Sequence, residues 1–190
     1  MKRIVFFTAI VLLTWVLNAQ KDTAFYRHEV KASVGDAILP SLAWSDNGIY
    51  YVNLTFSYHY RIFRWFWVGG NFIHSFGDKQ IYTWREYYPN GVFRDISKWK
   101  PKYCVAIAPE IRFSYLNRKS IILYSSISAG IGLEDGYSSR NEKYPKITPY
   151  IQLTYIGASG SFGKNKNIFL GGEIGVGFKG FCNIHGGYRF

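Results

Sequence analysis

Serine and histidine lie close together at two places in the sequence, and a serine activated by a histidine is a common nucleophile of acyl transfer. Ser57 and His59 are two residues apart, so in a strand both side chains would point to one face. His74 and Ser75 are adjacent, so in a strand they would point to opposite faces. We expect no catalytic residue, because the strand pattern described below turns Ser57 and His59 inward, but an acyl hydrolase remains an alternative.

A metal or phosphate site would need clustered ligands or a glycine-rich loop between a strand and a helix. The histidines fall in four separate segments, at His28, His59, His74 and His185, and no metal-ligand spacing is present. The glycines recur within apparent strands instead of forming a phosphate loop. The sequence therefore predicts neither a metal nor a cofactor.

Composition limits the class of protein. The chain has 190 residues, 19% of them aromatic and 18% charged, which indicates a single β-rich domain and excludes disorder and coiled coil. The formal net charge is +11, but lysine and arginine do not cluster on one element, so we expect no nucleic-acid partner. An anionic lipid surface fits the charge better.

The N-terminus is typical of a secretory signal peptide. Lys2 and Arg3 precede an apolar run from Ile4 to Leu17, and the small residue Ala19 follows. The run is shorter than the roughly 20 residues that a transmembrane helix needs. We predict a signal peptide at 1–19 and one domain at 20–190.

The remaining chain repeats segments of about ten residues in which every second residue is apolar, the pattern of a transmembrane β-strand. In 103–115, for example, Ile107 and Ile111 alternate with Glu110 and Arg112. In 168–178, apolar residues ending with Phe178 alternate with glycines and one glutamate. Eight such segments occur, at 27–35, 51–60, 65–76, 103–115, 121–133, 147–158, 168–178 and 181–190.

The connections between these segments alternate in length. Short connections are expected at 61–64, 116–120 and 163–167, and long ones at 36–48, 77–101 and 134–146. Outer-membrane barrels have short periplasmic turns and longer outer loops. The predicted fold is therefore all-β: an eight-stranded antiparallel up-and-down transmembrane β-barrel with short periplasmic turns and longer outer loops.

Aromatic residues collect near the short connections, where a barrel meets the headgroup layer. The predicted aromatic girdle consists of Tyr58, Tyr60, Trp65, Trp67, Tyr115, Tyr155 and Phe190. The chain ends with Tyr188-Arg189-Phe190, two aromatic residues flanking an arginine.

This ending and the strand pattern from Arg27 to Phe190 resemble the small eight-stranded outer-membrane β-barrel proteins of Gram-negative bacteria. The resemblance implies that Tyr188 and Phe190 form the signal read by the barrel-assembly machinery. It also implies residence in the outer membrane after export, with membrane lipid and lipopolysaccharide as partners. We expect a monomer.

The interior of an eight-stranded barrel is only wide enough for side chains to fill it, so charged residues there must be paired. The inward positions of the predicted strands carry six ionisable residues that we expect to form an ion-pair network, Glu110, Arg112, Glu173, Arg189, His59 and His185.

The long connection at 77–101 combines aromatic and cationic residues and is the candidate surface-binding loop. Its candidate residues are Tyr82, Trp84, Arg85, Tyr87, Tyr88, Phe93, Arg94 and Trp99. Lipopolysaccharide or a surface glycan is the expected partner.

The sequence thus favours a non-enzymatic outer-membrane barrel with a structural or surface-interaction role. A lipid-modifying barrel enzyme, such as a lipid A acyl hydrolase, is one alternative. A soluble secreted barrel that binds a small apolar ligand is another.

Overall fold

The computed structural model describes residues 26–36, 48–87, 93–118, 120–137 and 143–190. Within these ranges it describes the backbone alone at 48–50, 79–87, 93–97, 136–137 and 143. The predicted signal peptide at 1–19 lies outside the described residues. No helix among them is long and apolar enough to cross a membrane.

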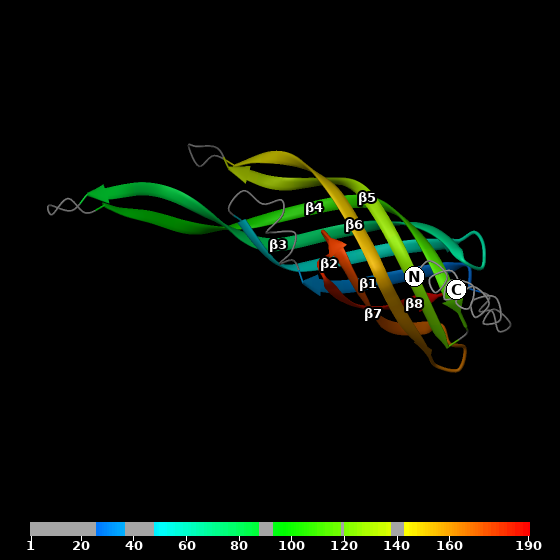
Figure 1. Ribbon diagram of the computed structural model, residues 1–190. Coiled ribbons are helices and arrows are strands. Elements are labelled where there is room, and N and C mark those ends of the chain that lie inside the picture. The colour runs from blue at the N-terminus through cyan, green and yellow to red at the C-terminus, as the bar shows by residue number, and fades with distance from the viewer. Residues whose placement is uncertain (1–25, 37–47, 88–92, 119, 138–142) are drawn as a thin grey trace, which may run out of the picture.

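The described chain forms a closed barrel in which each strand pairs with the next one antiparallel and the last pairs with the first (Figure 1). The all-β, eight-stranded up-and-down barrel predicted from the sequence is confirmed. Its strands are β1 (His28–Asp36), β2 (Gly48–Arg61), β3 (Phe66–Tyr87), β4 (Phe93–Asn117), β5 (Ile121–Tyr137), β6 (Lys143–Phe162), β7 (Ile168–Gly177) and β8 (Cys182–Arg189).

The three short connections lie where the sequence predicts them, but two of the three long ones are wrong. Residues 77–101 are not a loop, since β3 continues to Tyr87 and β4 begins at Phe93. Most of the predicted connection at 134–146 likewise belongs to β5 and β6. Cross-strand pairing continues past the level where charged and aromatic residues end the alternation of apolar residues.

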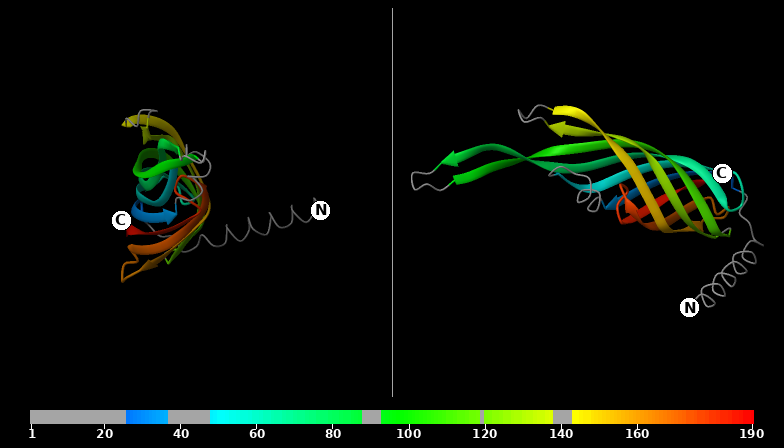
Figure 2. Two further views of the ribbon diagram at one scale, coloured as in Figure 1. Left: turned by 90° about the vertical axis from the view of Figure 1, so that its left-hand side faces the viewer. Right: turned by 45° about the horizontal axis from the view of Figure 1, so that its top comes forward.

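The strands differ greatly in length, so the barrel wall is tall on one side. β1, β7 and β8 have 9, 10 and 8 residues, whereas β3 and β4 have 22 and 25. β2 pairs with β3 only as far as Lys79, so the outer part of β3–β4 is a two-stranded ribbon that extends beyond the barrel (Figures 1 and 2). We call residues 79–87 and 93–101 the β3–β4 hairpin.

The turn between β7 and β8 folds inward. Gly177 and Gly180 have φ values of +137° and +93°, a backbone region that favours glycine. Asp36 fixes the turn, because its carboxylate accepts hydrogen bonds from the backbone N–H groups of Phe181 and Cys182 at 3.0 and 2.8 Å. Phe178, an outward residue in the sequence pattern, is therefore inside and only 5% exposed.

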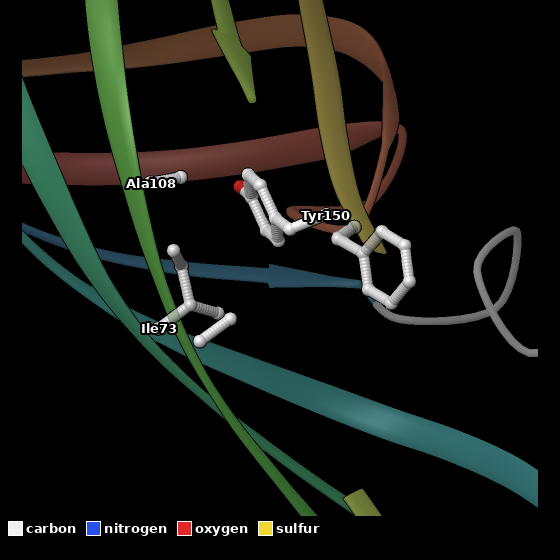
Figure 3. Close-up of a cluster of buried hydrophobic side chains, with 5 residues drawn as sticks. Ile73, Ala108 and Tyr150 are labelled. Atoms are coloured by element: carbon white, nitrogen blue, oxygen red, sulfur yellow. The ribbon is translucent and has the colours of Figure 1, made fainter. Parts of the chain in front are cut away.

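Among the described residues, two small apolar clusters lie inside the barrel. Trp67, Ile122 and Tyr124 pack together toward the short turns. The other cluster consists of Ile73, Ala106, Ala108, Tyr150 and Phe178. Figure 3 shows the labelled side chains of Ile73, Ala108 and Tyr150 converging from three different strands. Between and beside these clusters the interior is polar.

Candidate functional site

Among the described residues, the interior of the barrel contains nine buried charged residues, five cations and four carboxylates. They come from five strands, β1, β4, β5, β7 and β8, and from the turn between β7 and β8: Glu29, Lys31, Lys102, Glu110, Arg112, Glu134, Glu173, Lys179 and Arg189. Each carboxylate lies within ion-pair distance of at least one of the cations. Buried charges are tolerated when they are paired in this way.

Glu29 on β1 is the centre of the largest group. Its Oε1 accepts a hydrogen bond from Arg112 Nη1 at 2.6 Å, and its Oε2 accepts one from Arg189 Nε at 2.8 Å. The remaining guanidinium nitrogens of Arg189 donate to Ser161 at 2.7 Å and Ser159 at 2.6 Å. One carboxylate thus binds two arginines, Arg189 from the neighbouring strand β8 and Arg112 from β4.

Each of these arginines also lies over an aromatic ring. The guanidinium carbon of Arg112 is 4.2 Å from the ring centre of Tyr124, and that of Arg189 is 4.0 Å from the ring centre of Phe169. Such contacts stabilise a desolvated cation by about 1–2 kcal/mol.

Glu110 on β4 organises a second group. Its Oε2 accepts hydrogen bonds from Lys179 Nζ at 2.6 Å and from Asn71 Nδ2 at 2.7 Å, and its Oε1 lies 3.1 Å from His59 Nε2. Lys179 comes from the inward β7–β8 turn, so this ion pair ties the turn to the opposite wall. His59 is also 3.1 Å from Arg112 Nη2, which joins the two groups.

A third pair, Lys31 with Glu173, lies on β1 and β7. Tyr124 donates a hydrogen bond to the same Glu173 oxygen at 2.5 Å. Lys102 and Glu134 form a separate pair on the tall wall, closer to the β3–β4 hairpin.

All six residues predicted for the interior network are buried inside the barrel. In the structure, His59 lies within hydrogen-bond distance of both Glu110 and Arg112. Arg112 and Arg189 both donate hydrogen bonds to Glu29, which links Arg189 to this group. Glu173 bonds with Lys31, and His185 lies beside the rings of Phe169 and Tyr124. Neither ring nitrogen of His185 has a hydrogen-bond partner within the described part of the chain.

Sequence reasoning missed five members of the interior set, Glu29, Lys31, Lys102, Glu134 and Lys179. A signal for the first two existed, because they alternate with Val30 and Ala32 on β1. The sequence pattern could not predict that Lys179 is inside the barrel, because it does not indicate that the turn carrying this residue folds inward.

The hydrogen bonds of Ser57, the candidate nucleophile, and of His59, its candidate base, go to other residues. Ser57 donates its hydroxyl proton to Asn71 Oδ1 at 2.6 Å, and His59 is held between Glu110 and Arg112. Ser75 is buried on the inner face of β3, whereas the ring of His74 packs beside Phe76 on the outer face. In the described ranges no group of three histidine, cysteine or acidic residues is arranged to hold a metal ion.

The predicted girdle residues lie on the outside of the barrel with one exception. Tyr58, Tyr60, Trp65, Tyr155 and Phe190 are exposed, and Tyr115 is partly exposed.

The assignment of Trp67 to the girdle is wrong, because this side chain is inside and 1% exposed. β3 begins at Phe66, so Trp65 belongs to the turn, and two-residue periodicity does not relate it to Trp67. Arg61 lies over the Trp67 ring, 5.4 Å from its centre, and covers it at the end of the barrel.

The terminal aromatic residues seal the seam between β1 and β8 on the outside. The ring of Phe190 stacks on His28 with centroids 5.1 Å apart, and Tyr188 lies 6.2 Å from Phe190. His28 Nδ1 is 2.7 Å from the Tyr58 hydroxyl. The role of Tyr188 and Phe190 as an assembly signal stays a prediction.

Most of the predicted surface-binding residues can be placed by backbone alone. Six of them lie on β3 and β4, where only the backbone is described: Tyr82, Trp84, Arg85, Tyr87, Phe93 and Arg94. Tyr88 lies outside the described residues. Trp99 on β4 is described and is 53% exposed.

No protein-family model matches the chain, and no curated protein matches it. Among solved structures, the chain is similar to Ail, the attachment invasion locus protein of Yersinia pestis, solved in complex with the heparin analogue sucrose octasulfate. The sequence identity is 15%, the match covers 86% of this chain and 95% of that chain, and the TM-score is 0.41. At this level the similarity says nothing about what the present chain binds.

Proposed function

We propose that the chain is a non-enzymatic integral outer-membrane β-barrel with a surface-interaction role. The observation that carries this proposal is its inverted distribution of residues, with charges inside and large apolar side chains outside. Each of the eight strands has at least one large apolar side chain that is between 46% and 70% exposed: Val34, Phe56, Phe72, Ile107, Ile131, Ile151, Leu170 and Ile184.

This apolar surface would be energetically unfavourable in water. Leaving such a side chain half exposed forfeits roughly 1–2 kcal/mol. Eight of them would cost on the order of 10 kcal/mol, as much as the whole stability of an ordinary domain. Since the interior is polar, no large apolar core offsets that cost. A lipid environment removes it, which favours the membrane barrel over the soluble ligand-binding barrel.

The orientation follows from the connections. The short turns at 62–65, 118–120 and 163–167 would face the periplasm, and the β3–β4 hairpin would face outward. Inside the membrane the ion-pair network fills the lumen, so its role in this proposal is to hold the barrel closed and not to conduct.

A heat-modifiability gel tests the membrane assignment. The mature protein from a washed outer-membrane fraction should migrate as a compact, faster species before boiling and as a slower one afterwards. Recovery of the protein from the soluble periplasm, with no shift on boiling, would instead favour the lumenal ligand binder.

The surface role is assigned to the β3–β4 hairpin. Lys98 and Lys100 occupy alternate positions of β4 and therefore share one face, while Trp99 and Tyr103 occupy the other. Trp99 is 53% exposed and Tyr103 is 41% exposed. A cationic face backed by an aromatic face suits a phosphorylated glycolipid or an anionic glycan.

Binding of purified lipopolysaccharide to the detergent-solubilised barrel tests this role. The double variant Lys98→Gln/Lys100→Gln should bind about fivefold more weakly per lysine removed, in low salt. Lys146→Gln, which removes one charge from β6 outside the hairpin, is the control and should bind normally. Equal binding by all three proteins would remove the hairpin from the proposal.

A lipid A acyl hydrolase is the second candidate, and no contact in the described residues favours it. Its nucleophile would have to be Ser57, whose hydroxyl is engaged by Asn71 within the lumen.

A further inference from the structure

The short turns at one end of the barrel are bonded to one another in a circle. Asn117 Nδ2 donates to the Arg64 carbonyl oxygen at 2.8 Å, and Lys166 Nζ donates to the Ser120 hydroxyl at 3.3 Å.

The circle closes through the residues that precede β1. The Tyr26 hydroxyl donates to the Asn165 carbonyl oxygen, and the Arg61 N–H donates to the Arg27 carbonyl oxygen at 2.8 Å. Four contacts thus connect three turns and the start of β1 around the barrel end. These contacts hold the four segments together at one end of the barrel.

The circle of turns, defined as residues 26–27, 61–65, 117–118, 120 and 163–167, is cationic. It carries Arg27, Arg61, Arg64, Arg118, Lys164 and Lys166, and no side-chain carboxylate. The nearest one, Glu29, is inside the barrel, where Arg112 and Arg189 occupy both of its oxygens.

These cations repel one another. Arg27 and Arg64 lie close enough to Arg61 for their charges to act on it. Among the described residues of this circle no side-chain carboxylate offsets the accumulated charge. An anionic partner would therefore be attracted to this end of the barrel.

Large apolar side chains stand directly beside the cations. Phe63 and Trp65 flank Arg64 and are 57% and 48% exposed, while Ile121 and Phe162 border the other two turns and are 47% and 55% exposed. An apolar band followed immediately by a row of cations matches the boundary between hydrocarbon and phosphate groups in a bilayer.

We propose that this circle of turns binds the phosphate groups of anionic phospholipids. The inference rests on the membrane barrel proposed above, whose orientation places the short turns in the phospholipid leaflet of the outer membrane. Each cation near the surface favours an anionic over a zwitterionic headgroup by about fivefold. The bound lipid would then form an anionic ring that neutralises this end of the protein.

The test uses the full barrel reconstituted in mixed bilayers, with spin-labelled phosphatidylglycerol and spin-labelled phosphatidylcholine as probes of the lipid shell. The variant Arg64→Gln/Arg118→Gln/Lys164→Gln removes three exposed charges. The matched control Lys98→Gln/Lys100→Gln/Lys146→Gln removes three charges from the tall wall and its hairpin, which do not face the lipid of this leaflet.

The wild type should associate more strongly with phosphatidylglycerol than with phosphatidylcholine. The turn variant should lose most of the preference for phosphatidylglycerol, by about fivefold for each cation removed, and the control should keep it. A high salt concentration should weaken the preference of the wild type.

Three results would overturn the inference. If all three proteins insert and show equal preference, or if the control loses as much as the turn variant, the circle of turns is not the lipid site and the membrane barrel still stands. If the solubilised wild type shows no lipid preference but is retained on an anionic polymer through these cations, the partner is a periplasmic polyanion. If the wild type gives no compact species on an unboiled gel, the proposed function itself fails and the inference fails with it.

Discussion

The two substitutions Glu29→Gln and Arg189→Met should have unequal effects on the stability of the barrel. The interior contains five buried cations and four buried carboxylates. Glu29→Gln leaves three carboxylates for five cations, whereas Arg189→Met brings the two signs into balance. The substitution that removes a negative charge should therefore be the more destabilising one.

The contacts of Glu29 give the magnitude. Without its carboxylate, Arg189 retains two serine hydroxyls and no acidic partner, while Arg112 retains only Glu110 at 3.6 Å. Removing one member of a buried ion pair costs about 3–5 kcal/mol because the other charge is left unpaired. We expect Glu29→Gln to lie in that range and Arg189→Met to cost less than half as much, since Arg112 still neutralises Glu29 at 2.6 Å.

Urea unfolding of protein refolded into detergent micelles measures both free energies of unfolding, with the compact gel species as a second readout. Working with refolded protein separates stability from any effect of position 189 on assembly in the cell. An Arg189→Met variant that is destabilised as much as Glu29→Gln, or more, would refute the argument from charge balance.

Four other substitutions test separate parts of the structure. Ile107 is 64% exposed, so Ile107→Arg should cost about 2–4 kcal/mol in a bilayer, whereas a soluble barrel would tolerate it; unfolding in lipid vesicles distinguishes the two. Gly180→Ala would place a methyl group 1.5 Å from the Asp36 carbonyl oxygen at a φ of +93°, and should lower the free energy of unfolding by about 2–3 kcal/mol; an unchanged urea midpoint would mean that the turn is not held inward. Lys166 has a φ of +59°, so Lys166→Gly should raise stability by roughly 1 kcal/mol in the same assay, and a loss would show that its exposed contact outweighs the backbone strain. Ser57→Ala should leave the mass profile of lipid A unchanged, because its hydroxyl serves Asn71; a changed profile with folded protein would restore the hydrolase.

The strands could be predicted from the sequence because both faces of each strand have an unambiguous environment. On β4, Ile107 and Ile111 alternate with Glu110 and Arg112, and any shift by one residue would put charges into lipid. The same physical contrast places Glu110, Arg112, Glu173 and Arg189 inside.

The errors occur where that contrast is absent or interrupted. Trp65 and Trp67 are chemically alike, so only the start of β3 at Phe66 determines that the second is buried. The 77–101 segment lacks a sustained alternation of apolar and polar residues, because neither face of a ribbon beyond the barrel lies against lipid or the barrel interior.

The sequence could not predict which side chains form ion pairs with each other across the barrel. Glu29 and Lys31 alternate correctly with apolar neighbours, but nothing local indicates that Glu29 will meet two arginines. Lys179 reaches Glu110 only because two glycines turn its hairpin inward, which is a property of the closed fold.

The interior ion pairs join residues that are far apart along the chain. The Glu29–Arg189 pair spans 160 positions, Lys31–Glu173 spans 142 and Glu29–Arg112 spans 83. The Glu29–Arg189 pair joins β1 to β8 and cannot form before the first and last strands meet, so a partly assembled sheet exposes unmatched charges that keep it out of the hydrocarbon. Insertion and closure are thereby coupled into one cooperative and slow event, as expected for a topology dominated by contacts between distant residues. The network therefore influences the assembly of the barrel as well as its final structure, because all of its ion pairs are present together only in the closed barrel.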